Sequence, residues 1–210
     1  ALAFSVGKIP EGKGLLVITN AGGPGIIAAD TAERVGIELP HMTKESITEM
    51  AKRLPPNATV FNPVDVIGDA TSARYAAVLE QAAKDPNVDG MLVILTPQAM
   101  TDVEKTADVV IASAKSTNKP VIASFMGEKR VRTAIDKLKA ASIPNFSYPE
   151  AAVKAFKRLS DQGAWKNHQP EELVTSWYNF ETAAETISGI LKNCVYQVGE
   201  EEAMQILTYY

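Results

Sequence analysis

The sequence predicts an α/β protein built around a doubly wound parallel sheet, with a helical tail at the C-terminus. Three apolar runs rich in Val and Ile carry this prediction: Leu15 to Thr19, Met91 to Leu95, and Val121 to Phe125. They are nearly continuous, which is typical of strands buried on both faces. Longer amphipathic stretches alternate with them, and this alternation indicates βαβ units in one sheet.

The other elements follow from weaker patterns. Residues 38–42 and 145–147 are further strand candidates, which makes five strands and fits the flavodoxin-like order 2-1-3-4-5. Gly36 suits a C-cap, Thr43 can begin a helix, and Thr101-Asp102-Val103-Glu104 is a capping-box pattern. The helices are predicted over 25–36, 43–53, 72–84, 101–116, 130–141 and 149–159.

The chain divides by composition. Residues 1–13 are expected to be a linker, 14–159 the α/β domain, 160–178 a polar linker, and 179–210 two helices belonging to a following module. The chain begins without Met and ends in a helical apolar pattern. These ends favour a piece of a longer polypeptide, with a natural, frayed C-terminus as the alternative.

Charge and composition exclude several functions. The net charge of -4 argues against binding to a nucleic-acid backbone. No apolar run approaches the roughly 20 residues that span a bilayer, so no membrane partner is expected. The single cysteine, Cys194, allows no internal disulfide, which favours a cytoplasmic protein.

The sharpest local motif follows the first strand. It reads Asn20-Ala21-Gly22-Gly23-Pro24-Gly25-Ile26 and opens a helix. One interpretation is a tight turn without a ligand, and another is a dinucleotide fingerprint, Gly23-x-Gly25-x-x-Ala28. The favoured interpretation is a site for one phosphate or carboxylate, bound by the free N–H groups of Gly25, Ile26 and Ile27. No Gly-Lys-Ser/Thr follows, which excludes a Walker motif.

Two further loops are candidates for substrate positioning. Thr96-Pro97-Gln98-Ala99-Met100 ends the third strand, and its alternative role is helix capping beside a solvent-facing glutamine. The loop Asn62 to Asp69 offers Asn62 and Asp65, although such residues are also common in turns. The sequence shows no Cys/His cluster, nucleophile elbow or triad, so it predicts neither a metal site nor a catalytic residue. Lys129, Arg130 and Arg132 form a basic cluster that either begins a solvated helix or guides a phosphate.

These motifs resemble a known family. The segment Leu15 to Glu33, with Asn62-Pro63-Val64-Asp65 and Thr96-Pro97-Gln98, is similar to the fifth domain of the ADP-forming acyl-CoA synthetases. These enzymes belong to the succinyl-CoA synthetase superfamily. The similarity covers roughly residues 5–160, and Glu200 to Tyr210 resembles the first helix of the family's ATP-grasp module.

The resemblance implies one domain of a ligase that interconverts acyl-CoA, ADP and phosphate with acid, CoA and ATP. Residues 20–25 would begin a helix whose N-terminus faces a phosphohistidine. That histidine lies in the preceding domain in the family, and neither His41 nor His168 matches its motif. The resemblance also implies that phosphate binds here, whereas CoA and Mg-ADP or Mg-ATP bind to other domains or subunits. Two alternatives remain open: a non-catalytic module that binds a nucleotide or a protein, and a flavin carrier.

Overall fold

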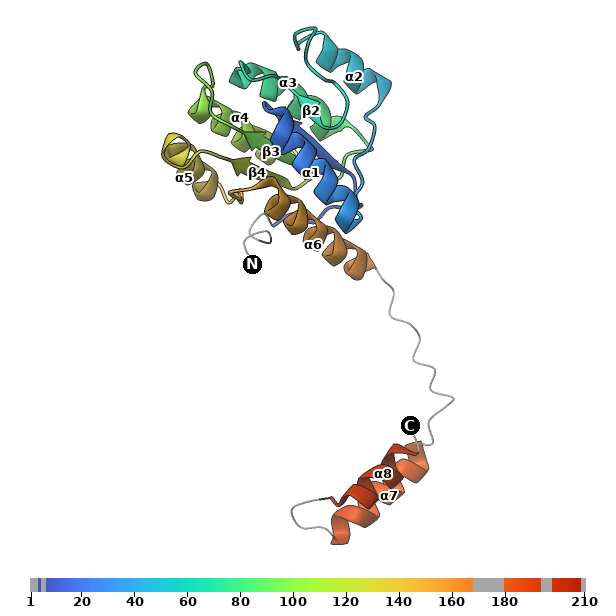
Figure 1. The fold of residues 1–210 in the computed structure, drawn as a ribbon. Helices are drawn as coiled ribbons and strands as arrows, with labels where there is room; N and C mark the ends of the chain where they lie inside the picture. The colour runs from blue at the N-terminus through green and yellow to red at the C-terminus, as the bar shows by residue number, and fades with distance from the viewer. Residues whose placement is uncertain (1–3, 5–6, 168–179, 194–197, 209–210) are drawn as a thin grey trace. The chain divides into compact units, whose positions relative to one another are not determined.

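The computed structural model describes residues 4, 7–167, 180–193 and 198–208. The chain divides into two compact units, residues 1–168 and 169–210, and each is described by itself. Among the described residues, the first unit contains the sheet and six α-helices, and the second contains two helices (Figure 1). Among the described residues, no helix is both long enough and apolar enough to cross a membrane.

The first unit is built on a parallel sheet of four strands in the order β2-β1-β3-β4. The strands are β1 (Leu15–Thr19), β2 (Val64–Asp65), β3 (Gly90–Leu95) and β4 (Val121–Phe125). β1 and β3 lie side by side, with Val17 opposite Leu92. All residues of β1, β3 and β4 are buried, as their continuous apolar sequences predict.

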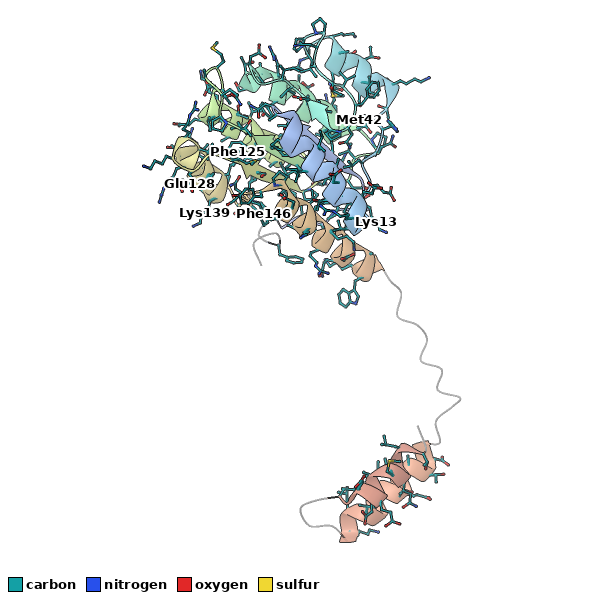
Figure 2. The ribbon with its side chains drawn as sticks, viewed as in Figure 1. Lys13, Met42, Phe125, Glu128, Lys139 and Phe146 are labelled. Carbon is teal, nitrogen blue, oxygen red and sulfur yellow. The ribbon has the colours of Figure 1, made fainter. Side chains whose placement is uncertain are left out.

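Helices cover both faces of the sheet. The first unit contains α1 (Gly22–Val35), α2 (Lys44–Ala51), α3 (Ser72–Lys84), α4 (Val103–Ser116), α5 (Arg132–Ala140), α6 (Pro149–Asn167) and a 3-10 turn, η2 (Glu128–Arg130). Alternate residues of each strand face opposite sides, so two apolar cores form. Leu15 and Val17 pack in the core that contains residues of α1 and α6, and Leu16 and Ile18 pack in the core that contains residues of α3, α4 and α5. Phe146 packs against the first of these cores and Phe125 belongs to the second (Figure 2). The doubly wound prediction is therefore confirmed.

Two predicted strands are wrong in part. The second strand of the sheet is Val64–Asp65 and not residues 38–42, of which only Glu38 forms an isolated bridge, with Gly14. The predicted fifth strand is reduced to one bridge between Ala123 and Asn145. The Asn145 side chain accepts the Phe125 N–H at 2.8 Å, so a side chain replaces a backbone carbonyl there and the strand does not continue.

Several helix boundaries also differ from the prediction. α1 begins at Gly22, three residues earlier than expected, although Gly36 caps its end as predicted, with φ 71°. Asp102 caps α4 by accepting the Lys105 N–H at 3.1 Å, so the helix begins at Val103 and the predicted capping box from Thr101 does not form. The predicted helix 130–141 is shortened to α5, which begins at Arg132, and Arg130 belongs to the preceding turn η2.

α6 continues to Asn167, eight residues beyond its predicted end and into the range predicted as linker. The reason is packing against the N-terminal segment. Ser160 is buried and its hydroxyl donates to Gly12 O at 3.0 Å. A Cβ at Gly163 would lie 2.5 Å from Pro10 O, so the backbone of the segment touches this helix directly. The Lys8 ammonium also donates to carbonyls at the end of α4. Residues 8–13 are therefore packed against the domain and not extended away from it.

Asp85, just after α3, connects that helix to α2. Its carboxylate accepts the Thr43 N–H at 2.8 Å and the Thr43 hydroxyl at 3.0 Å, and Thr43 is the N-cap of α2. Burial pushes the pKa of Asp85 up, but hydrogen bonds from Ser46, Thr43 and Asn87 outweigh burial and hold the pKa below its ordinary value.

The second unit contains α7 (Phe180–Asn193) and α8 (Glu200–Leu207), which contact each other. Ala183 is buried, while Leu191, Met204 and Leu207 are exposed. Two helices are thus present within the range 179–210, where the sequence predicts two. Most of the linker predicted over 160–178 lies outside the described residues.

Candidate functional site

The glycine-rich loop after β1 forms the first turn of α1. The Thr19 hydroxyl donates to Ala21 O at 2.8 Å and accepts the Ala21 N–H at 3.0 Å, which fixes the end of the strand. Ala21 is the N-cap, and it provides no side-chain hydrogen bond to the helix. The Gly25 N–H donates to Ala21 O at 3.3 Å. The first N–H groups of a helix have no carbonyl partner within the helix. Because Pro24 has no N–H, the unpaired N–H groups at the start of α1 are those of Gly22 and Gly23, and not those predicted at 25–27.

The glycines of this loop differ in the space around them. A Cβ at Gly23 would have no heavy atom within 4 Å, so this position faces open space. A Cβ at Gly25 would lie 3.0 Å from Thr19 Cγ2, so Gly25 is required for packing. The first turn carries no acidic residue. The arrangement provides an uncapped helix N-terminus that an anion can approach at Gly22 and Gly23.

Asn20 joins the loop after β1 to the loop after β3. It is only 2% exposed. Its amide donates to Thr96 O at 2.8 Å, and its carbonyl oxygen accepts the Thr96 N–H at 2.9 Å and the Thr96 hydroxyl at 3.2 Å. The predicted strand order places β1 beside β3, which is confirmed, and the loops that follow these two strands are bonded to each other. The Asn20 side chain, however, is committed to Thr96 and acts on the site by holding the loops together.

The loop after β3 carries the exposed side chains of Gln98, Ala99 and Met100. The Gln98 N–H donates to the Thr101 hydroxyl at 3.0 Å, which closes the loop on itself. A Cβ at Gly68 would lie 3.8 Å from both Asn20 O and Gln98 Cγ, so three loops meet at this edge of the sheet. Arg130 also contacts this loop, donating to Pro97 O and Gln98 O. The sequence offers only its place in a basic cluster as a signal of that contact.

Two residues at β2 have different roles: Asn62, just before the strand, supports the sheet, and Asp65, at the end of the strand, lies at the candidate site. Asn62 accepts the Val17 N–H at 3.0 Å and donates to Leu15 O at 2.8 Å. Its amide thus extends the edge of β1, so the side chain supports the strand. Asp65 accepts the Ile67 N–H at 2.8 Å, and its other carboxylate oxygen would be 3.8 Å from a Cβ at Gly22. Asp65 therefore lies beside the glycine loop.

Tyr75 of α3 supports the carboxyl end of β3 from within the core, a role that sequence reasoning missed. It is fully buried, and its hydroxyl donates to Ile94 O at 3.0 Å, near the end of β3. Burial, and after it the negative charge of Asp65, raises the pKa of Tyr75. The hydroxyl therefore stays protonated at neutral pH and keeps donating to the strand.

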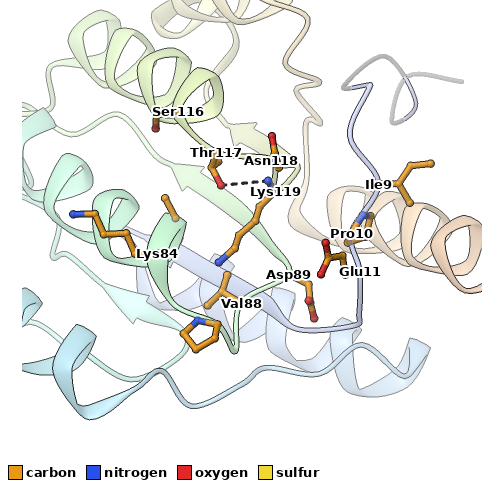
Figure 3. Close-up of a pocket in the computed structure, with 12 residues that line it drawn as sticks. Ile9, Pro10, Glu11, Lys84, Val88, Asp89, Ser116, Thr117, Asn118 and Lys119 are labelled. Atoms are coloured by element: carbon orange, nitrogen blue, oxygen red, sulfur yellow. Dashed lines mark hydrogen bonds between the residues drawn. The ribbon is translucent and has the colours of Figure 1, made fainter. Parts of the chain in front are cut away.

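A separate hollow of about 560 Å³ lies at the opposite, amino edge of β3 and β4 (Figure 3). It is lined by the N-terminal segment and by the ends of α3 and α4, including Pro10, Asp89 and Lys119. The Lys119 ammonium donates to Ala82 O at 3.0 Å and to Asp85 O at 2.5 Å, so it caps α3. This lysine is accounted for by the fold, and the hollow is remote from the glycine loop.

Comparison with known proteins assigns this chain to a family. Residues 15–167 match the model of the Ligase-CoA domain. ADP-forming acetate–CoA ligase I of Archaeoglobus fulgidus is 34% identical over 92% of this chain and 28% of its own length. ADP-forming 4-hydroxybutyrate–CoA ligase of Nitrosopumilus maritimus is 28% identical over 100% of this chain and 30% of its own length. The chain therefore spans less than a third of these relatives.

Solved structures give the same result. A crystal structure from Pyrococcus horikoshii matches with a TM-score of 0.75 and 32% identity, over 80% of this chain and 39% of that one. Acetyl-coenzyme A synthetase 1 of Ca. Korarchaeum cryptofilum matches with a TM-score of 0.69 and 30% identity, over 80% of this chain and 38% of that one, in a complex with phosphate and ADP. This chain belongs to the CoA-ligase domain family of the ADP-forming acyl-CoA synthetases, in the succinyl-CoA synthetase superfamily.

Proposed function

We propose that this domain positions phosphate and the acid substrate in a synthetase that interconverts acyl-CoA, ADP and phosphate with acid, CoA and ATP. The observation that carries the proposal is the uncapped, open start of α1 at Gly22 and Gly23. It lies where the Asn20–Thr96 hydrogen bonds join the ends of two central strands. The carboxyl ends of neighbouring parallel strands are the usual ligand site in sheets of this kind.

The phosphate-binding segment is residues 20–26, and its parts have different roles. The N–H groups of Gly22 and Gly23 are the donors to the anion. Asn20, Ala21 and Gly25 hold the turn through the contacts described above. One exposed helix N-terminus stabilises an anion by about 0.3–1 kcal/mol, and by up to about 2 kcal/mol when partly buried. A phosphohistidine dianion from a neighbouring domain gains from these donors because they are fixed in advance.

Substrate positioning falls to the loops beside this turn. The loop of Thr96, Pro97, Gln98 and Ala99 can hold a carboxylate or acyl oxygen through the Gln98 side-chain amide. The Thr96 N–H and hydroxyl are bonded to Asn20 and the Gln98 N–H to Thr101, so these groups shape the loop. Asp65 is an unsuitable neighbour for a second anion because it carries negative charge itself. It is suited instead to accepting a hydrogen bond from an imidazole N–H, and so to orienting the histidine that carries the phosphoryl group. Asn62 contributes indirectly, through the edge of β1.

The remaining machinery is assigned to other domains or subunits: CoA binding, the phosphohistidine, and an ATP-grasp module for Mg-ADP and Mg-ATP. Alignments with the two Pyrococcus furiosus relatives named as alpha subunits cover 78% and 73% of this chain. Those with the Archaeoglobus fulgidus and Nitrosopumilus maritimus ligases cover 92% and 100%. This difference supports a parent in which residues 169–210 lead into a fused module.

The test is an assay of the complete parent polypeptide. With acyl-CoA, ADP and phosphate it should form ATP, while the 210-residue chain alone should form none. Formation of AMP and pyrophosphate from acid, CoA and ATP would contradict the proposal, as would turnover by the isolated chain. A parent that only binds nucleotide or protein would favour the non-catalytic alternative.

A further inference from the structure

Arg130 bridges two loops at the carboxyl edge of the sheet. It ends η2, the turn that follows β4. One guanidinium nitrogen donates to Pro97 O at 3.2 Å and the other to Gln98 O at 3.0 Å. The planar fork of arginine suits two neighbouring acceptors, an arrangement that the single ammonium of lysine reproduces poorly.

The backbone brings Arg130 to this position. The Met126 N–H donates to Leu95 O at 2.8 Å, which continues the pairing of β3 and β4 into the loops. Gly127 has a φ of 118°, and a Cβ there would lie 2.8 Å from Pro97 Cγ. A glycine is therefore required both for the backbone conformation and for the close approach. The turn after β4 is thus packed directly on the loop after β3.

These contacts form a continuous series across the edge of the sheet. Arg130 holds Pro97 and Gln98, and the adjacent Thr96 is bonded to Asn20 at the start of α1. We propose that Arg130 is a positioning residue for the acid substrate, because it fixes the loop that presents the exposed Gln98 side chain. The inference rests on the proposed function.

Loss of the guanidinium should loosen the loop and leave the fold intact. Arg130 is exposed, so water can replace it at the two carbonyls. The cost of ordering the loop is then added to substrate binding. Because water replaces the guanidinium at both carbonyls, the net loss should be roughly tenfold in affinity, which corresponds to about 1.4 kcal/mol. Arg130→Ala should therefore raise the KM for the acid about tenfold, with kcat and the KM for nucleotide changed less than about twofold.

Hydrogen exchange on the 210-residue chain tests the contact without any assay of activity. The Gln98 N–H donates to the Thr101 hydroxyl and the Thr101 N–H donates to Gln98 O, so both report on the closed loop. Arg130→Ala should speed their exchange about tenfold. Arg132→Ala is the matched control, since it removes the same charge from an exposed position two residues away.

The kinetic arm uses the complete synthetase. Arg130→Ala should raise the KM for the acid, Arg130→Lys should restore part of the loss, and Arg132→Ala should behave as wild type. Unchanged loop exchange in Arg130→Ala would overturn the inference, as would equal effects of the two alanine variants or a fall confined to kcat. A wild-type parent without ADP-forming activity would instead overturn the proposed function, a separate outcome.

Discussion

Replacement of Asn20 by Ala tests the connection between the two central loops. The buried amide makes three hydrogen bonds to Thr96, of 2.8, 2.9 and 3.2 Å. Each such bond contributes about 1 kcal/mol net, with a range of roughly 0.5–1.5. Alanine removes all three, and the partly buried Thr96 backbone is left with incomplete pairing. We therefore expect Asn20→Ala to lower the free energy of unfolding by about 2–3 kcal/mol.

Asn20→Asp separates the amide from the shape of the side chain. Aspartate keeps an oxygen that can accept the Thr96 N–H, but it loses the donor to Thr96 O. A charged oxygen then faces that carbonyl at hydrogen-bond distance, which is repulsive. Asn20→Asp should be at least as destabilised as Asn20→Ala at pH 7, and it should recover part of the loss as the carboxyl is protonated at low pH.

The assay is urea unfolding of the 210-residue chain, followed by far-UV circular dichroism. With a slope of about 2 kcal/mol/M, the expected loss lowers the unfolding midpoint by about 1–1.5 M. Asn118→Ala is the control because Asn118 is an exposed asparagine in a loop at the opposite edge. If Asn20→Ala and Asn118→Ala unfold within about 0.5 kcal/mol of each other, the joining role of Asn20 is refuted.

Three further outcomes follow from the contacts. Asp65→Asn keeps an acceptor for the Ile67 N–H but removes the charge, so the parent should fold normally and lose at least about tenfold in kcat/KM; wild-type kinetics would exclude the role of the carboxylate. Since the folded pKa of Asp85 is lowered, its contribution to stability is present above the unfolded value of 3.8 and is lost as the pH falls through the folded pKa. Stability measured between pH 7 and pH 2 should fall less steeply in Asp85→Asn, and an unchanged slope would contradict this. Gly163→Val should destabilise the domain by at least about 1 kcal/mol in urea unfolding because its Cβ meets Pro10 O; an unchanged midpoint would show that residues 8–13 do not pack there.

The three long strands were predictable because burial on both faces leaves a continuous apolar run. β1 and β4 match their predicted bounds, and β3 differs by one residue. β2 was not predictable, because only Val64 and Asp65 pair and the preceding edge is completed by the Asn62 side chain. The end of α6 was missed for a similar reason, since its last turns pack against a segment about 150 residues earlier in the sequence.

The location of the candidate site was also predictable in outline. The sequence identifies the glycine loop and the Thr96 loop, and the parallel order of their strands brings them to one edge. The roles of individual side chains depend on distances that no local pattern encodes. Asn20 and Asn62 are polar residues in loops, yet both are bonded to backbone groups. Arg130 looks like a solvated charge in the sequence and is bonded to the neighbouring loop in the fold.

The central claim is that phosphate approaches the backbone at Gly23, and one measurement in the complete synthetase tests it most directly. A Cβ at Gly23 meets nothing within 4 Å, so Gly23→Val should fold with an unchanged melting temperature and still place its side chain where the phosphate must approach. Glu33→Val, an exposed position near the other end of α1, is the control. The rate of ATP formation from acyl-CoA, ADP and phosphate should fall by at least about a hundredfold in Gly23→Val and stay at the wild-type value in Glu33→Val. A folded Gly23→Val enzyme with wild-type turnover would show that this glycine loop is only a turn.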